Sequence, residues 1–99
     1  MPIFKTAQYQ VRPESVDKCT EANREFIAYV KTNEPGTLRY TCLQRVDDPT
    51  SFMNFMIFQD AGAEEQHRKS EGVRRFTEIL YPETVAGVAF TDYATVAST

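Results

Sequence analysis

Apolar and polar residues alternate at the start of the chain, and the apolar residues that follow are three to seven positions apart. The alternation over residues 3–11 predicts a strand. Its apolar face contains Ile3, Ala7, Tyr9 and Val11. Pro13 and Glu14 then suit the first turn of a helix. That helix carries an apolar stripe along about five turns. The stripe consists of Val16, Cys19, Phe26 and Val30, with Ala22 and Asn23 between them. We therefore expect one side of the helix to be buried.

A hairpin is predicted after this helix. Pro35-Gly36 ends the helix, because proline cannot continue the hydrogen-bond ladder and glycine accepts the backbone angles of a reversal. Residues 37–46 then read as a strand, of which one face carries Leu38, Tyr40 and Cys42. The sequence Asp47-Asp48-Pro49-Thr50 supplies turn chemistry. The strand over residues 37–46 should therefore pair with the next one, over residues 52–58.

The strand over residues 52–58 is apolar on both faces apart from Asn54. A strand buried on both sides in so short a chain needs helices over one face and a second layer over the other. A partner sheet would provide that layer. A buried amide without a partner costs about 1–3 kcal/mol. Asn54 is therefore expected to be hydrogen-bonded, either to the backbone or to a ligand.

A second helix and a last strand complete the pattern. Asp60 is a good N-cap for a helix that starts near Ala61 and is expected to bend at Gly72. Its inner face consists of Ala63, His67, Ser70, Val73, Phe76 and Leu80. Tyr81-Pro82-Glu83 ends it, and a strand lies within residues 85–96. The order βαββαβ predicts a ferredoxin-like α+β fold in one domain over residues 1–99, with a four-stranded antiparallel sheet and two helices on one face.

Composition and charge narrow the function classes. The 99 residues are 41% hydrophobic and 25% charged, which is ordinary for a globular domain. The net charge of -3 and the scattered basic residues argue against nucleic-acid binding. No stretch approaches the ~18 apolar residues of a membrane span, and the N-terminus lacks the pattern of a signal peptide, so we expect a cytoplasmic protein. Cys19 and Cys42 match no metal-ligand spacing, which favours thiols in the core over a disulfide or zinc site.

Residues around the third strand carry a resemblance to a known family. Phe58 ends the strand, Asp60 leads into a helix, His67 follows nine residues after Phe58, and Phe76 comes later on the same face. This arrangement resembles the antibiotic biosynthesis monooxygenase family, in the superfamily of dimeric α/β barrels. Glu34-Pro35-Gly36 is similar to the loop before the family's second strand. The resemblance implies a homodimer formed by sheet-to-sheet packing, with an apolar pocket between the sheet and helices of each subunit.

The resemblance also implies a type of chemistry. Family enzymes act on phenolic or quinol substrates, often with oxygen and with no flavin, metal or haem. The sequence agrees, because it has no glycine-rich phosphate loop and no ligands near its lone histidine at metal spacing. Many members carry a glutamate where this chain has Met56. The haem-degrading branch is disfavoured, since its asparagine, tryptophan and histidine positions are Ala7, His67 and Thr77 here.

His67 is the candidate catalytic residue. Histidine is the residue type whose unperturbed side-chain pKa lies near neutrality, so this residue could accept the proton of a phenol. The alternative is a partly buried helix residue that is hydrogen-bonded to a neighbour. The candidates for substrate binding are Tyr9, Tyr40, Asn54, Phe55, Phe58 and Phe76. Each of these could equally be a packing residue of the core.

Three functions remain open on the sequence alone. The first is a cofactor-independent monooxygenase that acts on a small aromatic or quinol substrate, with His67 as the base. The second is an isomerase for a small hydroxyketone, in which the same histidine enolises the substrate. The third is a non-enzymatic, dimeric ligand-binding or stress-associated protein. A cavity of about the usual ligand size, a few hundred Å³, beside His67 would favour an enzyme.

Overall fold

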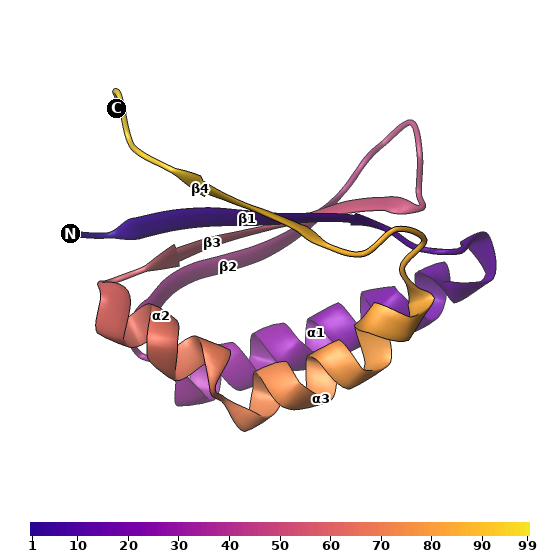
Figure 1. Cartoon of the computed structure of the whole chain (residues 1–99), viewed down its shortest axis with the longest axis horizontal. Coiled ribbons are helices and arrows are strands. Elements are labelled where there is room, and N and C mark those ends of the chain that lie inside the picture. The colour runs from indigo at the N-terminus through magenta and orange to yellow at the C-terminus, as the bar shows by residue number, and fades with distance from the viewer.

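The computed structural model describes residues 1–99 as one antiparallel sheet with helices on one face (Figure 1). The strands, in spatial order, are β2 (Thr37–Gln44), β3 (Ser51–Phe58), β1 (Ile3–Gln10) and β4 (Ala89–Tyr93). The helices are α1 (Val16–Asn33), α2 (Ala61–Arg68) and α3 (Glu71–Leu80), with short 3₁₀ turns η1 (Pro13–Ser15) and η2 (Tyr81–Glu83). The predicted βαββαβ fold is confirmed, with the second helix divided in two.

The main core lies between α1, α3 and the inner face of the sheet. The predicted stripe of α1 is buried, and its residues from Cys19 to Val30 contact the strands. Phe26 stacks on Phe76 of α3 with ring centroids 4.6 Å apart. Such a pair contributes more than its buried area alone. The remaining side of α1 is polar, and no helix of the chain is long and apolar enough to cross a membrane.

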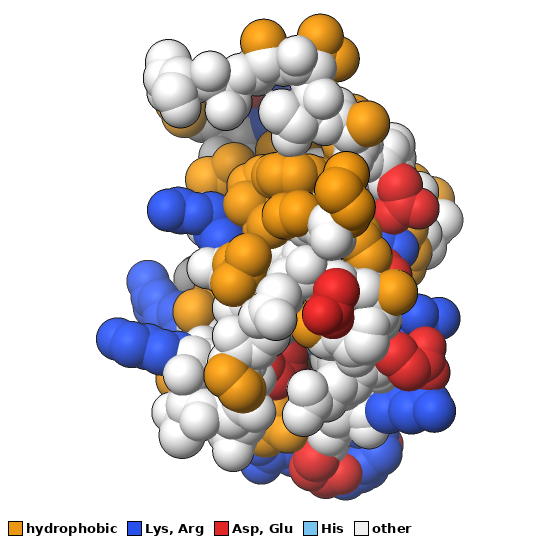
Figure 2. Space-filling view, turned by 90° about the vertical axis from the view of Figure 1, so that its left-hand side faces the viewer, with side chains coloured by type: hydrophobic (Ala, Val, Ile, Leu, Met, Phe, Trp, Pro, Cys, Tyr) orange, Lys and Arg blue, Asp and Glu red, His pale blue; other side chains and the backbone are white.

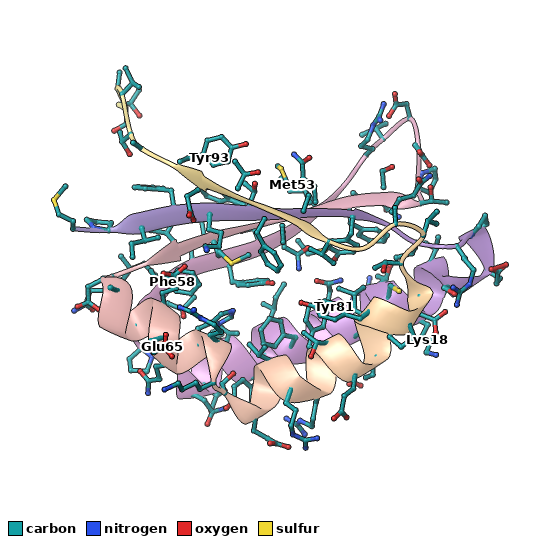
Figure 3. The ribbon with its side chains drawn as sticks, in the orientation of Figure 1. Lys18, Met53, Phe58, Glu65, Tyr81 and Tyr93 are labelled. Atoms are coloured by element: carbon teal, nitrogen blue, oxygen red, sulfur yellow. The ribbon has the colours of Figure 1, made fainter.

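β3 is apolar on both faces, as predicted. Its even-numbered residues, including Asn54, are buried beneath the helices, and its odd-numbered residues are half-buried on the outer face. Figure 3 shows Met53 of β3 and Tyr93 of β4 on this outer side, while Phe58 points into the space between the layers. Thr6 of β1 is also buried on the outer face, and its hydroxyl has no hydrogen-bond partner. In a single chain, therefore, no second layer covers the outer face of β3.

The prediction that Leu38 shares a face with Tyr40 is wrong. Thr37 pairs with Phe58, but Arg39 already pairs with Ile57, so β2 has one extra residue at Leu38. This β-bulge turns Leu38 outward, where it is 56% exposed. Alternation in the sequence could not reveal an added residue, because a bulge shifts the side-chain phase only from that point onward.

The second helix breaks at Ser70 rather than at Gly72. Ser70 has an extended backbone, and its side chain accepts a hydrogen bond from the Val73 N–H at 3.1 Å, which starts α3. Gly72 instead lies within α3. A glycine at this position leaves room for Tyr29 of α1, which packs directly against it. A Cβ at position 72 would come within 2.2 Å of the Tyr29 ring. The glycine therefore serves the close approach of two helices.

We expect Gly72→Ala to destabilise the protein. The added methyl must displace the Tyr29 ring, and overpacking of this kind costs about 1–3 kcal/mol, which outweighs the roughly 0.5–1 kcal/mol that alanine gains in a helix. Urea denaturation measures the change. In a Tyr29→Ala background the same substitution should cost nothing.

Gly62→Ala in α2 is the matched control, because its Cβ would only reach ordinary contact with Asp60 at 3.4 Å. The control should leave the free energy of unfolding equal or slightly higher. Equal stability of Gly72→Ala and the parent chain would show that Tyr29 does not require a glycine.

Candidate functional site

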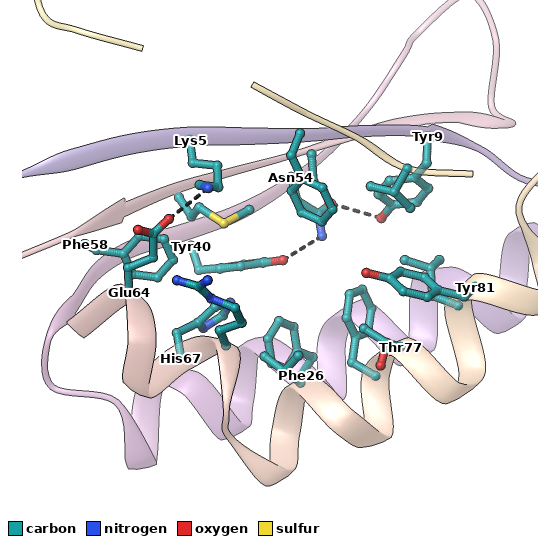
Figure 4. A pocket seen from close by; sticks show the side chains of 18 residues that line it. Lys5, Tyr9, Phe26, Tyr40, Asn54, Phe58, Glu64, His67, Thr77 and Tyr81 are labelled. Atoms are coloured by element: carbon teal, nitrogen blue, oxygen red, sulfur yellow. Dashed lines mark hydrogen bonds and ion pairs between the residues drawn. The ribbon is translucent and has the colours of Figure 1, made fainter. Parts of the chain in front are cut away.

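A cavity of about 420 Å³ lies between the inner face of the sheet and helices α2 and α3. Its size is within the range of ligand pockets, and most of the residues around it are apolar. Figure 4 shows His67 on the helix side and Asn54 on the sheet side of this space. Six of the seven predicted site residues line it: Tyr9, Tyr40, Asn54, Phe58, His67 and Phe76.

Phe55 is the predicted site residue that does not line the cavity. It lies between Asn54 and Met56 on β3, and successive strand residues point to opposite faces. Since Asn54 and Met56 face the helices, Phe55 faces outward and is half-buried there. The strand's aromatic run gave no sign of which face was inward, and the side-chain alternation seen in the structure decides it.

His67 is hydrogen-bonded to a buried carboxylate. Its Nδ1 lies 2.7 Å from Oε1 of Glu34, and the two side chains are only 12% and 4% exposed. The Nε2 of His67 makes no hydrogen bond within the chain, and the imidazole lines the cavity. The ring also lies against Phe58, with centroids 4.9 Å apart. The histidine is thus bonded to a side chain on one side and free on the other.

The local fold places Glu34 opposite His67. Glu34 is the C-cap of α1, and its N–H donates to the Val30 carbonyl at 2.9 Å. The chain then reverses at Pro35-Gly36, where a Cβ on Gly36 would come within 2.6 Å of Ala63 Cβ in α2. Only glycine permits this approach, and it brings the start of β2 against the helix that carries His67. Thr37 adds a hydrogen bond to Glu34 Oε1 at 2.8 Å.

The electrostatics favour an ionised Glu34. Burial alone would raise the pKa of this carboxyl group, but hydrogen bonds from His67 and Thr37 outweigh burial and lower it. A carboxylate beside Nδ1 accepts the Nδ1–H of a neutral imidazole, which fixes the tautomer and leaves the lone pair on Nε2. The carboxylate would also stabilise an imidazolium. This pair can therefore accept a proton from a molecule in the cavity.

A second polar group is a closed ring of hydrogen bonds deeper in the cavity. The Tyr9 hydroxyl donates to Asn54 Oδ1 at 2.9 Å, Asn54 Nδ2 donates to Asn23 Oδ1 at 2.9 Å, and Asn23 Nδ2 donates to the Tyr9 hydroxyl at 3.0 Å. Asn54 Nδ2 also donates to the Tyr40 hydroxyl at 2.9 Å. The prediction that Asn54 is hydrogen-bonded is confirmed, and its partners are side chains. Burial raises the pKa of Tyr9 and Tyr40, so both stay protonated at neutral pH.

Charged residues lie at the end of the cavity near α2. Lys5 of β1 is 2.8 Å from a Glu64 oxygen and 3.1 Å from an Asp92 oxygen. The hydrogen bond to Glu64 is the main reason that the pKa of Lys5 is raised. Lys5 pairs across the sheet with Met56, the position at which the family resemblance expects a glutamate. Met56 carries no charge that could pair with Lys5. The carboxylates of Glu64 and Asp92 neutralise this lysine instead.

The chain has no cluster of metal ligands. No group of three or more histidine, cysteine, aspartate or glutamate side chains is placed to hold an ion. Both cysteines are free, with Cys19 buried and Cys42 half-buried. Burial raises the pKa of the Cys42 thiol. The contact with Tyr9 lowers this pKa by a smaller amount.

Comparison with known proteins identifies the family of this chain and supports its fold. The family model for antibiotic biosynthesis monooxygenase matches residues 2–79. The chain therefore belongs to this family, as the residues around Phe58 and His67 predict. The sequence matches none of the curated proteins with which it was compared.

Solved structures support the fold. One described as an antibiotic biosynthesis monooxygenase is 21% identical, with a TM-score of 0.88 over 96% of this chain and 99% of that one. A Nitrosomonas europaea protein of the same description is 18% identical, with a TM-score of 0.90 over 99% and 93%. One from Caulobacter crescentus is 18% identical, with a TM-score of 0.90 over 97% and 91%. At these identities the likeness establishes the fold alone.

Sequence reasoning missed Glu34 and Asn23 as site residues. Glu34 stands in the Glu-Pro-Gly segment that resembles the family loop, but its distance of 33 positions from His67 hides the pairing. Asn23 is an amide inside the apolar stripe of α1, just as Asn54 is an amide inside the apolar β3. Two amides on two buried faces are a signal that they bond to each other, since each needs a partner.

Glu34→Gln should lower the free energy of unfolding at pH 7 by about 1.5–3 kcal/mol, the usual contribution of hydrogen bonds to a charged group. The pKa of folded Glu34 is below its ordinary value, so ionised Glu34 stabilises the fold above pH ~4.3, the unfolded pKa. That contribution is lost as pH falls through the folded pKa. Urea denaturation at pH 7 and pH 3 should therefore show a smaller difference between variant and parent at pH 3.

Glu65→Gln is the control for this experiment. Glu65 lies on the same helix as His67 but is 46% exposed, and it pairs only with Arg68 and Lys69 on the surface. Its loss should change stability by less than about 1 kcal/mol. A Glu34→Gln effect of equal size at both pH values would contradict the assignment of the charge.

Proposed function

We propose that this chain is a cofactor-independent monooxygenase that acts on a small aromatic or quinol substrate. The observation that carries the proposal is the His67–Glu34 pair: the His67 ring lines a mostly apolar cavity of about 420 Å³, and its Nε2 has no hydrogen-bond partner within the chain. Family membership supports the reaction class. A neutral aromatic ring suits a cavity lined by Phe26, Phe58 and Phe76, because burial of its apolar surface drives binding.

The first step is removal of a phenolic proton. A phenol has a pKa of about 10, so it is rarely ionised in neutral solution. Nε2 of His67 takes the proton, and the carboxylate of Glu34 stabilises the imidazolium that results. The low polarity around the ring strengthens this attraction compared with water. The phenolate formed is richer in electrons and can reduce molecular oxygen.

The overall reaction balances without an added reductant. A quinol and O₂ give a hydroxyquinone and water: one oxygen atom forms the new C–O bond and the other leaves as water. The quinol supplies all four electrons that O₂ accepts. The role of this chain's residues is therefore to bind the ring, remove a proton and exclude bulk water.

His67→Ala tests the proposed base. Loss of a general base lowers rates by about 10²–10⁴-fold, so oxygen uptake with a panel of quinols should fall by that amount. A Clark electrode measures uptake directly. Gln66→Ala, at an exposed neighbouring position on α2, is the matched control and should keep the parent rate.

The outcomes separate the three functions considered for this chain. Equal oxygen uptake by the parent and His67→Ala would remove the proposed base. Turnover of a hydroxyketone with no oxygen uptake would indicate the isomerase. Binding without any turnover would indicate a ligand-binding protein.

We also propose that the chain forms a homodimer through the outer face of its sheet. That face carries Phe4, Met53, Phe55 and Ile57, all half-buried, and the exposed Tyr93. Figure 2 shows hydrophobic side chains gathered near the end of the sheet, below the C-terminal segment, with charged residues mostly nearer the helices. The buried Thr6 hydroxyl, which has no partner, lies in the middle of this face. A second copy would supply the layer that covers it.

Phe55→Asp should disrupt this dimer. A charge buried without a partner costs far more than one left in water, so the equilibrium should shift to monomer. Sedimentation equilibrium should give twice the mass of one chain for the parent and the mass of one chain for the variant. Ala28→Asp, on the exposed side of α1, is the control and should remain dimeric. A parent chain that sediments as a monomer would overturn the proposal.

A further inference from the structure

One backbone carbonyl sets the direction of every hydrogen bond in the polar ring. Nδ2 of Asn23 lies 2.9 Å from the carbonyl oxygen of Cys19, and a carbonyl can only accept. The nitrogen of the Asn23 amide must therefore be on that side. Its oxygen is then on the other side, 2.9 Å from the amide of Asn54. The orientation of Asn23 thus follows from the helix backbone of α1.

The orientation of Asn54 follows in turn. Asn23 Oδ1 can only accept, so the nearby atom of Asn54 must be the donating Nδ2. The same nitrogen is 2.9 Å from the Tyr40 hydroxyl, and its second hydrogen points there. Asn54 Oδ1 accepts from Tyr9, whose oxygen accepts from Asn23. The donors and the amide oxygens of Tyr9, Asn23 and Asn54 are all engaged.

Only one hydrogen of this network is left without an acceptor, that of the Tyr40 hydroxyl. The Tyr40 oxygen accepts from Asn54, so its own hydrogen must point elsewhere, and no hydrogen bond donated by Tyr40 exists within the chain. Tyr40 lines the cavity from the sheet, close to His67, with ring centroids 5.7 Å apart (Figure 4). The burial that raises its pKa keeps the hydroxyl protonated.

We infer that Tyr40 donates this hydrogen to a carbonyl oxygen of the substrate, so that the cavity selects aromatic rings that bear a ketone or quinone oxygen as well as a phenolic hydroxyl. The inference deepens the proposed function and rests on it for the role of the cavity. His67 would accept the phenolic proton, while Tyr40 recognises the second oxygen. A site with a fixed donor discriminates strongly against ligands that lack the acceptor, because the donor is then left unpaired.

A matched pair of ligands tests this directly. 7-Hydroxy-1-tetralone and 5,6,7,8-tetrahydro-2-naphthol share one skeleton and one phenolic hydroxyl, and only the first has a carbonyl. Isothermal titration calorimetry gives the ratio of their Kd values without any turnover. We expect Tyr40→Phe to reduce the preference for the tetralone by about tenfold, the upper range for one neutral hydrogen bond.

Tyr81→Phe is the control. It removes another tyrosine hydroxyl that points into the cavity and leaves the polar ring intact, so the preference should persist (Figure 4). Thermal denaturation of each variant confirms that it is folded.

A measurement on the parent chain needs no substitution. The carbonyl stretching frequency of ¹³C-labelled 7-hydroxy-1-tetralone should be lower when bound than in hexane, because a donated hydrogen bond weakens the C=O bond. An unshifted frequency would overturn the inference. So would equal affinities of the parent for both ligands, or a preference lost in Tyr81→Phe and kept in Tyr40→Phe.

The test is independent of the reaction. A carbonyl preference that depends on Tyr40 supports the inference whether or not quinols consume oxygen. Conversely, His67-dependent oxygen uptake with no carbonyl preference supports the proposed function and overturns the role of Tyr40.

Discussion

Buried amide groups must find partners, and this requirement ties the layers of the protein together. Tyr9, Asn23 and Asn54 come from β1, α1 and β3, and their hydrogen bonds close into a ring with no spare donor. An unpaired amide in such a place costs about 1–3 kcal/mol. The ring therefore fixes how α1 sits on the sheet. The floor of the cavity and the direction of Tyr40 both follow from that placement.

The cavity has two polar systems with different properties. The ring is fully paired within the chain and is neutral, so it is suited to hold shape. The His67–Glu34 pair is charged and keeps one nitrogen free, so it is suited to exchange a proton. Aromatic side chains separate the two, with Phe26 in contact with both Tyr40 and His67. A planar ligand between them would meet a structural group at one end and a reactive group at the other.

The sequence predicts the fold well where one period dominates. The stripe of α1 and the two apolar faces of β3 follow directly from spacing, and Asp60 caps α2 as expected. Prediction fails where a contact between distant segments decides the outcome. Gly72 looks like a helix break until Tyr29 is placed against it.

The candidate site is predictable only in part, for the same reason. His67 could be proposed because it is the only histidine, and most cavity residues lie on predicted inner faces. Glu34 could not be paired with it, because that contact depends on the reversal at Gly36. Phe55 was misplaced because an apolar strand does not show which face is inward. Leu38 was misplaced because the bulge adds a residue.

The helix that carries His67 is only eight residues long and has no fully buried residue. It is held to the rest of the molecule by the contact of Ala63 with Gly36, by the Lys5–Glu64 ion pair and by the His67–Glu34 pair. The main hydrophobic core lies elsewhere, between the sheet, α1 and α3. Sequence change on α2 can therefore reshape one wall of the cavity at little expense to stability. The scaffold is thus free to acquire new substrates through its smallest helix.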